Sequence, residues 1–327
     1  MQHDIIVVGG SAGSLEALRG IVGALPSDLP ASLFLVVHVA PSTPSVLPMM
    51  LSRWSPLPAS EARDKEPIEK SRIYVAPADR HLLLRDGHVM LSRGPAENRA
   101  RPAIDPLFRS AARAFGSRVV GVVLSGYLDD GAAGLLAVKA AGGVCVVQSP
   151  DDALVPSMPR AALEAVEVDH IVTADALGPL LVRLATERAH VHTPPAVASS
   201  VAIEDEIAAG NASAHEKARE HAQPSGFGCP DCGGALFERN DGPLVRFRCR
   251  VGHAYSAANL AERQSEKLDD ALWVAYRAIE ERAALAHRLA DRAREQGRAE
   301  RAQRHEAEAS EFEARAKSLR DALGVSK

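Results

Sequence analysis

The chain has 327 residues, enough for about two domains at roughly 150 residues per domain. Hydrophobic residues make up 46% and charged residues 24%, which is typical of a globular protein. The formal net charge of -4 does not favour binding to nucleic acid or to an anionic membrane surface. No apolar run reaches the ~18 residues that span a bilayer, and the first residues, MQHDIIVVGG, lack the basic region and cleavage site of a signal peptide. We therefore expect a cytoplasmic protein without direct membrane insertion.

The first 187 residues alternate short apolar runs with amphipathic stretches. Expected strands are 4–9, 31–39, 72–77, 118–126, 143–148 and 169–174, and expected helices are 14–25, 105–116 and 131–142. Continuous β-branched runs between helices predict an α/β fold with a doubly wound, mostly parallel sheet covered on both faces. The exception is 81–92, where Asp86-Gly87 between two alternating runs predicts an antiparallel β-hairpin.

The remainder of the chain divides into three parts by composition. Residues 188–224 carry Pro194-Pro195 and no sustained apolar period, which indicates a linker with room for one short helix. Residues 225–255 hold a Cys/His cluster. Residues 256–327 have apolar residues and alanines seven apart, which predicts two helices joined near Gly297 and packed on each other or on a partner.

Ser11 lies in a glycine-rich stretch, Gly9–Gly13, that follows a strand and opens a helix. Glycines on a sharp strand-to-helix turn can expose a serine hydroxyl as a nucleophile, and the helix N-terminus offers N–H groups to an oxyanion. A plain turn or a phosphate cradle is the alternative. A dinucleotide site is disfavoured because Ser11 stands where the G-x-G-x-x-G pattern needs its second glycine.

His38 and Asp130 also follow predicted strands. If the strands are parallel, both residues lie at the carboxyl edge where α/β sites gather. Ser11, His38 and Asp130 then suit the roles of nucleophile, base and orienting carboxylate. Taken one at a time, these residues have simpler alternatives: His38 as the polar end of a strand, and Asp130 as the N-cap of the helix that follows it. The order Ser, His, Asp differs from the Ser, Asp/Glu, His order of α/β-hydrolases.

Six sequence blocks in this region have a shared order and spacing that resembles a known family. They are VVGGSAGSLEAL, VVHVAP, YVAPADRHL, RPAIDPLFRSAA, VVLSGYLDDGAAGL and VVQSPDDALVPSMPRAAL. Over about residues 4–187 the chain resembles the protein-glutamate methylesterases of bacterial chemotaxis (CheB-type catalytic domain). The resemblance implies that Ser11 is the nucleophile, His38 the general base and Asp130 its partner, with backbone N–H groups near Ala12 and Tyr127 as oxyanion donors. It implies no cofactor for catalysis and a methylated chemoreceptor or related signalling protein as partner.

The chain also departs from the family's pattern. Members usually have Thr and two glycines after the serine, His-Met-Pro after the second strand and Gly-Met-Gly in the aspartate loop. This chain has Ala12-Gly13-Ser14, His38-Val39-Ala40 and Gly126-Tyr127-Leu128. These changes touch the rim of the expected site, so they bear on substrate preference more than on chemistry. Members typically begin with a phosphorylatable receiver domain, whereas the catalytic pattern here begins at residue 4, so we do not expect that switch in cis.

Three of the four cysteines cluster with a histidine. Cys229 and Cys232 are separated by two residues, and Cys249 and His253 follow after 16 more, which is the ligand spacing of a zinc ribbon. A closed Cys₃His set indicates a structural zinc site. Free cysteines are the alternative. The other histidines considered, His81, His190, His192 and His287, are expected to be solvated.

Two functions remain open from the sequence. The first is a serine esterase that demethylates receptor glutamate methyl esters, with glutamine deamidation as a further activity implied by the resemblance. The second is a non-enzymatic signalling module that keeps the esterase scaffold to bind a partner. Because the expected triad precedes residue 131, we also expect residues 225–327 to choose a partner or mediate an oligomer and to do no chemistry.

Overall fold

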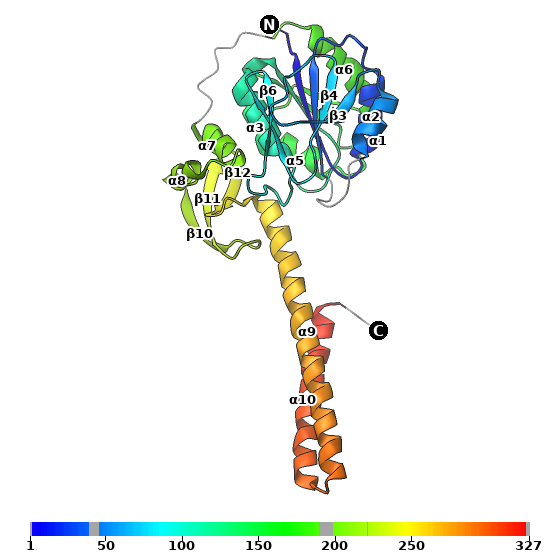
Figure 1. The fold of residues 1–327 in the computed structure, drawn as a ribbon, viewed down its shortest axis with the longest axis vertical. Coiled ribbons are helices and arrows are strands. Elements are labelled where there is room, and N and C mark those ends of the chain that lie inside the picture. Colours follow the sequence, from blue (N-terminus) through cyan, green and yellow to red (C-terminus); the bar gives the residue numbers. More distant parts are fainter. Residues whose placement is uncertain (1, 39–45, 190–198, 221, 325–327) are drawn as a thin grey trace. The chain divides into compact units, whose positions relative to one another are not determined.

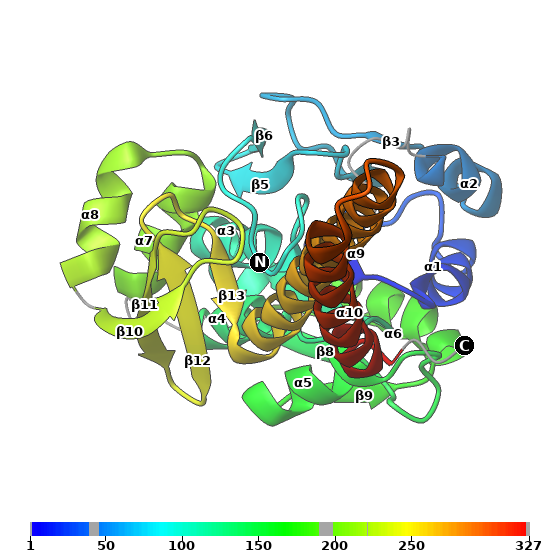
Figure 2. The ribbon, with the colours of Figure 1, turned by 90° about the horizontal axis from the view of Figure 1, so that it is seen from below.

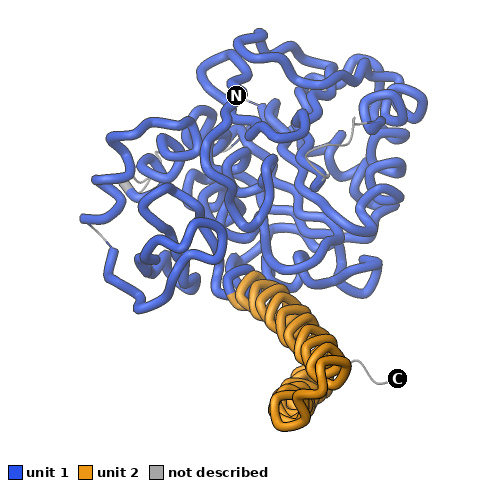
Figure 3. The backbone as a smooth tube through the Cα atoms, turned by 60° about the horizontal axis from the view of Figure 1, so that its bottom comes forward, with its two compact units in different colours: residues 1–260 blue, residues 261–327 orange. Residues whose placement is uncertain are grey.

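The computed structural model describes residues 2–38, 46–189, 199–220 and 222–324. The chain forms two compact units, residues 1–260 and residues 261–327, which are coloured separately in Figure 3.

A parallel sheet forms the centre of the first unit (Figure 1). It has seven strands, in the order β3-β4-β2-β1-β7-β8-β9. Its strands are β1 (Ile5–Gly10), β2 (Ser32–Val37), β3 (Ala59–Glu61), β4 (Arg72–Val75), β7 (Val119–Val123), β8 (Val144–Gln148) and β9 (His170–Val172). The surrounding helices are α1 (Ser14–Gly23), α2 (Leu47–Trp54), α3 (Ile104–Phe115), α4 (Ala132–Ala140), α5 (Ser157–Ala165) and α6 (Ala174–Thr186), with a 3₁₀ turn η1 (Gly116–Arg118) after α3. The six strands expected from the apolar runs are confirmed, and the short β3 is an addition.

Helices cover both faces of this sheet. Along β1, Ile6 and Val8 enter one apolar cluster with residues of α1, α2 and α6, while Ile5 and Val7 enter a second cluster with residues of α3, α4 and α5. Because both faces of each central strand are buried, the strands read as continuous apolar runs. The predicted doubly wound α/β fold is confirmed.

The order of the strands reverses at β1. From β1 the chain proceeds outward through β2 and β4 on one side, and later returns to place β7, β8 and β9 on the other side. In open parallel sheets, ligands bind outside the carboxyl ends of the strands at such a switch point. Here that point lies between β1 and β7, just before Ser11 and Asp130.

The predicted β-hairpin is also present. β5 (His81–Arg85) and β6 (His88–Ser92) pair antiparallel across the turn at Asp86-Gly87, where Gly87 has a φ of 74°. A glycine relieves the steric cost of that left-handed conformation.

The segment expected to be a linker contains two helices, α7 (Ser199–Ala208) and α8 (Ala212–Glu220), and its residues 190–198 lie outside the described part. Asp205 of α7 is fully buried and pairs with Arg85 of β5 and Arg113 of α3. This segment is therefore attached to the preceding α/β region by buried charge.

A second, four-stranded antiparallel sheet follows, in the order β10-β11-β12-β13. Its strands are β10 (Gln223–Gly228), β11 (Ala235–Asp241), β12 (Leu244–Cys249) and β13 (Ala254–Ser256). We call residues 223–256 the ribbon module. Figure 2 shows the four strands of this module together, next to the α/β region. Residues 96–98, before α3, pair with Ala254 of β13, and Arg246 and Arg248 of β12 form buried ion pairs with Glu97.

The expected helical pair is confirmed as α9 (Ala257–Glu295) and α10 (Ala299–Ala322), joined by a turn in which Gly297 has a φ of 71°. Within the second unit, buried alanines such as Ala290 and Ala309 line the contact between the helices. Ion pairs such as Arg282–Glu308 flank it. Among the described residues, no helix is long and apolar enough to cross a membrane.

Candidate active site and metal-binding cluster

Ser11 lies in the turn between β1 and α1. Its N–H donates to the Ser125 carbonyl over 2.9 Å, and its own carbonyl accepts from the Ser14 hydroxyl over 2.7 Å. Gly13 takes the left-handed conformation that starts α1, with a φ of 79°. These contacts hold the turn on both sides of Ser11 and leave its side chain partly exposed at the end of the strand.

Two glycines next to Ser11 admit no side chain. A Cβ on Gly9 would lie 2.3 Å from an Ile104 side-chain carbon, and a Cβ on Gly126 would lie 2.8 Å from the Ser11 Cβ. Gly126 follows β7 and is fixed by hydrogen bonds with Val155 and Met158. The loop after β7 therefore packs directly against the serine turn.

His38 follows β2, beside the serine turn. Its N–H donates to the Gly10 carbonyl over 3.2 Å, which continues the β1–β2 pairing by one residue. The imidazole Nε2 lies 2.8 Å from Asp130 Oδ2, and the side chain is 22% exposed. The Nδ1 atom is the nitrogen left for a proton from Ser11, although no hydrogen bond joins the Ser11 hydroxyl to this ring among the described residues. The expected rim substitutions at Val39 and Ala40 lie outside those residues.

Asp130 is a buried acceptor of four hydrogen bonds. Besides His38, it accepts the N–H groups of Ile104 and Asp105 at the start of α3, over 2.7 and 3.2 Å, and the Asn98 amide over 2.9 Å. Burial alone would raise the pKa of Asp130, but the hydrogen bonds from His38, Ile104 and Asn98 lower it. Asp130 is therefore a carboxylate, fixed in orientation, and it caps α3 rather than the helix that follows it.

Asp105 takes the complementary place at the start of α4. Its Oδ1 accepts the N–H groups of Gly131 and Gly134 over 3.1 and 2.6 Å, and its Oδ2 accepts the second bond from Asn98 over 2.9 Å. Burial, followed by the nearby charge of Asp130, raises the pKa of Asp105 to about 6. Asp105 was contained in the block RPAIDPLFRSAA, but sequence reasoning assigned no role to it or to Asn98, because neither has a spacing that signals a site.

The two expected oxyanion donors both border the serine turn. Ala12 directly follows Ser11, and its carbonyl accepts from the Ser125 hydroxyl over 2.8 Å. Tyr127 follows Gly126, and its side chain is 65% exposed. Within the described ranges, neither backbone N–H donates to a protein acceptor, so both are available to a bound oxygen.

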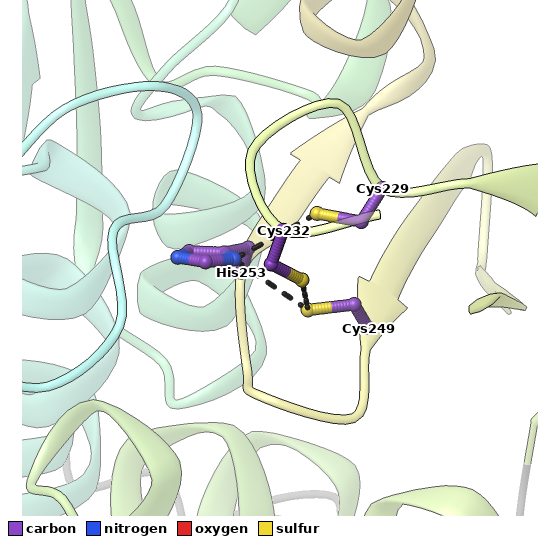
Figure 4. Close-up of side chains that lie close together, drawn as sticks. All are labelled: Cys229, Cys232, Cys249 and His253. Carbon is purple, nitrogen blue, oxygen red and sulfur yellow. Dashed lines mark hydrogen bonds between the residues drawn. The ribbon is translucent and has the colours of Figure 1, made fainter. Parts of the chain in front are cut away.

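Cys229, Cys232, Cys249 and His253 come together as the spacing predicts (Figure 4). Their donor atoms all lie within 4.8 Å of one another. The Cys232 and Cys249 sulfurs are 3.7 Å apart, and the sulfurs of Cys229 and Cys249 both lie within 3.7 Å of His253 Nδ1. Sulfurs bound tetrahedrally to zinc at ~2.3 Å are about 3.8 Å apart. Burial opposes ionisation of Cys229, but the Tyr255 hydroxyl and backbone N–H groups lower its pKa to about 7. This donor set fits one tetrahedral metal ion.

The other histidines differ from expectation in one case. His81 is fully buried, with its Nε2 2.9 Å from the Pro95 carbonyl, so the prediction that it is solvated is wrong. The strand β5 buries it because this face of the hairpin packs on α3. His287 is partly exposed, and His190 and His192 lie outside the described residues.

Comparison with known proteins supports the resemblance found in the sequence. The protein-family model described as CheB methylesterase matches residues 6–181. A relative from Leptospira interrogans is 35% identical over 185 residues, which cover 56% of this chain and 96% of that protein. The protein-glutamate methylesterase/protein-glutamine glutaminase 2 of Anaeromyxobacter dehalogenans is 39% identical over 172 residues, 53% of this chain and 50% of that protein, so the chain spans about half of its length.

A solved structure agrees. The crystal structure of the Thermotoga maritima CheB methylesterase catalytic domain matches with a TM-score of 0.54 and 31% identity, and the match covers 56% of this chain and 100% of that domain. The chain belongs to the CheB methylesterase family.

Proposed function

We propose that this chain is a protein-glutamate methylesterase that hydrolyses glutamate methyl esters on a chemotaxis-type receptor. The observation that carries the proposal is the 2.8 Å bond between His38 and buried Asp130, at the strand ends that flank Ser11. The names of the relatives support the same reaction. A cytoplasmic location remains part of this proposal.

In the proposed reaction the Ser11 oxygen attacks the ester carbonyl, and its proton passes to His38 Nδ1. Asp130 holds the ring through Nε2 and stabilises the imidazolium that forms. The negative charge on the carbonyl oxygen faces the N–H groups of Ala12 and Tyr127. His38 then returns the proton to the departing methanol, and a water molecule hydrolyses the acyl-enzyme by the same route. The Ser11–His38 contact is expected to form when the ester binds, as catalytic hydrogen bonds often tighten in the complex.

The same steps apply to a glutamine side chain, with ammonia as the leaving group. The relatives from Leptospira interrogans and Anaeromyxobacter dehalogenans are each named for both activities. We propose deamidation as a second activity of the same site, since both reactions proceed through one acyl-enzyme at a glutamyl carbonyl.

For the rest of the chain we propose the division expected from the sequence, with residues 1–187 catalytic, 188–224 connecting, 225–255 metal-binding and 256–327 helical. The metal is proposed to be one structural zinc ion, held by Cys229, Cys232, Cys249 and His253. Four protein ligands leave no open position for substrate, and a zinc ion supplies such a module with binding energy that folds it. The helical pair is proposed to bind a partner or a second copy of the chain.

The test is methanol release from methylated receptor by wild type and Ser11→Ala. We expect Ser11→Ala to lower turnover by about 10³-fold or more, because loss of a triad nucleophile removes the covalent route. Ser52→Ala, an exposed serine on α2, serves as the matched control and should keep wild-type turnover. Circular dichroism establishes that both variants fold. Retention of more than about a tenth of the activity by folded Ser11→Ala would rule out the proposed nucleophile.

A further inference from the structure

The ribbon module contacts the catalytic domain through its last strand, β13. The N–H of Ala254 donates to the Ala96 carbonyl over 3.2 Å, and the N–H of Asn98 donates to the Ala254 carbonyl over 2.8 Å. Ala254 and Asn98 are both buried. The segment 96–98 therefore pairs with β13 as though it were a further strand, and its position depends on the ribbon module.

The Asn98 side chain extends this contact to the proposed triad. Its Oδ1 accepts the N–H of Ser256 over 3.1 Å, while its Nδ2 donates to Asp130 and to Asp105, each over 2.9 Å. A carboxylate only accepts and a backbone N–H only donates, so the amide has one possible orientation. A continuous chain of hydrogen bonds thus runs from β13 through Asn98 and Asp130 to His38.

Asn98 has a backbone conformation that supports this role. Its φ is 48°, in the left-handed region that asparagine tolerates better than most residues other than glycine. The surrounding contacts hold it there, which is typical of positions where geometry serves a site.

A second set of bonds reaches the residue before Asp130. Asp129 Oδ1 accepts the Ser256 hydroxyl over 2.7 Å and the Asn259 amide over 2.5 Å. The Ser256 hydroxyl also accepts the Asn259 N–H at the start of α9. Both consecutive aspartates of the catalytic loop are therefore held from the end of the ribbon module.

The metal-binding cluster lies immediately before β13. Cys249 and His253 bracket the turn between β12 and β13, and the Cys249 N–H donates to the His253 carbonyl over 3.0 Å. The strand begins at the next residue, Ala254. A metal ion bound by both ligands would fix this turn, and without it the turn relies on a few backbone bonds.

We propose that Asn98 is a positioning residue that couples the metal-binding cluster to the triad carboxylate, so that zinc in the ribbon module sustains esterase turnover. The inference rests on the proposed function of Ser11, His38 and Asp130. Asn98 is buried and acts through Asp130, which orients His38. Displacing a catalytic group by about 1 Å can cost ~10²-fold in rate, so loss of the Asn98 bonds should lower kcat by about 10- to 100-fold with little change in KM.

The first experiment uses the full chain with 4-nitrophenyl acetate as substrate. Asn98→Ala should lower kcat by that factor while its zinc content stays at the wild-type level. Asn211→Ala is the matched control and should leave kcat unchanged, because this exposed asparagine at the start of α8 bonds to Glu206 and Ser213, both outside the proposed site. A folded Asn98→Ala with kcat within three-fold of wild type would overturn the proposal.

The second experiment removes zinc from the wild-type chain with a chelator and restores it with one equivalent of zinc ion. Removal should lower kcat about ten-fold or more, and restoration should recover it. In Asn98→Ala the same removal should cost less than three-fold further, because the link is already broken. Unchanged kcat in the zinc-free wild type would overturn the coupling. So would a kcat of zinc-free Asn98→Ala that is lowered by the full product of the factors for the substitution and for zinc removal.

The activities of Ser11→Ala, Asn98→Ala and the zinc-free wild type distinguish a failure of the proposed function from a failure of the coupling. If folded Ser11→Ala stays active, the proposed function itself fails. If Ser11→Ala is inactive while Asn98→Ala and zinc-free wild type are fully active, only the coupling fails. If Asn98→Ala does not fold, zinc removal from the wild type decides alone, through kcat measured beside circular dichroism.

Discussion

Glu97 is the buried carboxylate at the junction of the catalytic domain and the ribbon module. It has no exposed surface, and its two oxygens lie 2.7 and 2.8 Å from the guanidinium of Arg109. Arg246 and Arg248 of β12 each approach it to 3.3 Å. Burial by itself would raise the pKa of Glu97, but the three guanidinium groups, Arg109 foremost, lower it to about 2 from 4.5.

Glu97→Gln keeps the shape of this side chain and removes its charge. Each unit of pKa corresponds to about 1.4 kcal/mol, so the lowered pKa of Glu97 corresponds to about 3 kcal/mol of stability at pH 7. A loss of 3–5 kcal/mol is also typical when one partner of a buried ion pair is removed. We expect Glu97→Gln to lower the free energy of unfolding by about 3 kcal/mol at pH 7.

The pH dependence has a definite sign. The folded-state pKa of Glu97 lies below its unfolded value, so its contribution is present above pH 4.5 and is lost as pH falls toward 2. The difference between wild type and Glu97→Gln should therefore be full at pH 7 and reduced to about half or less at pH 3. Urea unfolding followed by circular dichroism at both pH values measures it.

Glu187→Gln is the matched control for this measurement. Glu187 pairs with Arg183 four residues earlier at 3.4 Å, and both side chains are about half exposed. Such a pair contributes less than about 0.5 kcal/mol. The reasoning on Glu97 would be refuted by a loss below 1 kcal/mol at pH 7, or by an equal loss at pH 7 and pH 3.

The remaining predictions concern the metal and the serine turn. The purified chain should contain about one equivalent of zinc by elemental mass spectrometry. Cys232→Ser should lose this zinc, and Cys145→Ser should retain it because Cys145 lies in β8 outside the cluster. Absence of metal from carefully purified protein would contradict the zinc site. Gly126→Ala would place a Cβ 2.8 Å from the Ser11 Cβ and should lower esterase turnover more than about ten-fold. Gly20→Ala, on the exposed side of α1 where the nearest atom is 3.7 Å away, is the control and should not change turnover. Equal activity of Gly126→Ala and Gly20→Ala would show that the serine turn can accommodate a methyl group at Gly126.

The catalytic sheet could be predicted from sequence because its strands are buried on both faces. A run such as VVGVV in β7 has no polar position, and neither a surface helix nor a half-exposed strand gives that pattern. The three-residue β3, with no buried position, gives no such signal. The turn at Asp86-Gly87 was predictable because the chemistry of the turn is local.

The segment 188–224 could not be read in the same way. Carboxylates anchor its helix α7 on two sides. Asp205 pairs with Arg85 and Arg113 of the catalytic domain, and Glu204 pairs with Arg248 of the ribbon module. Beside these charges α7 has only a few packed apolar residues, Val201, Ile203 and Ile207. They are too few to give a sustained apolar period, so the composition resembles that of a solvated linker. The partners of these acids lie about 90 or more residues earlier, or in a later module, where no local pattern refers to them.

The expectation that the C-terminal third does no chemistry came from the order of residues along the chain. All three proposed triad residues do precede residue 131, but Ser256 donates its N–H to Asn98 and its hydroxyl to Asp129. Sequence order shows which segment supplies a group and says nothing about what holds that group in place. The proposed triad carboxylate, Asp130, needs donors on the side away from His38. One of these donors, Asn98, is itself held by a strand that follows the proposed metal ligands. Because a buried amide must satisfy both its donor and its acceptor, the requirement for polar satisfaction links two modules whose sequences look independent.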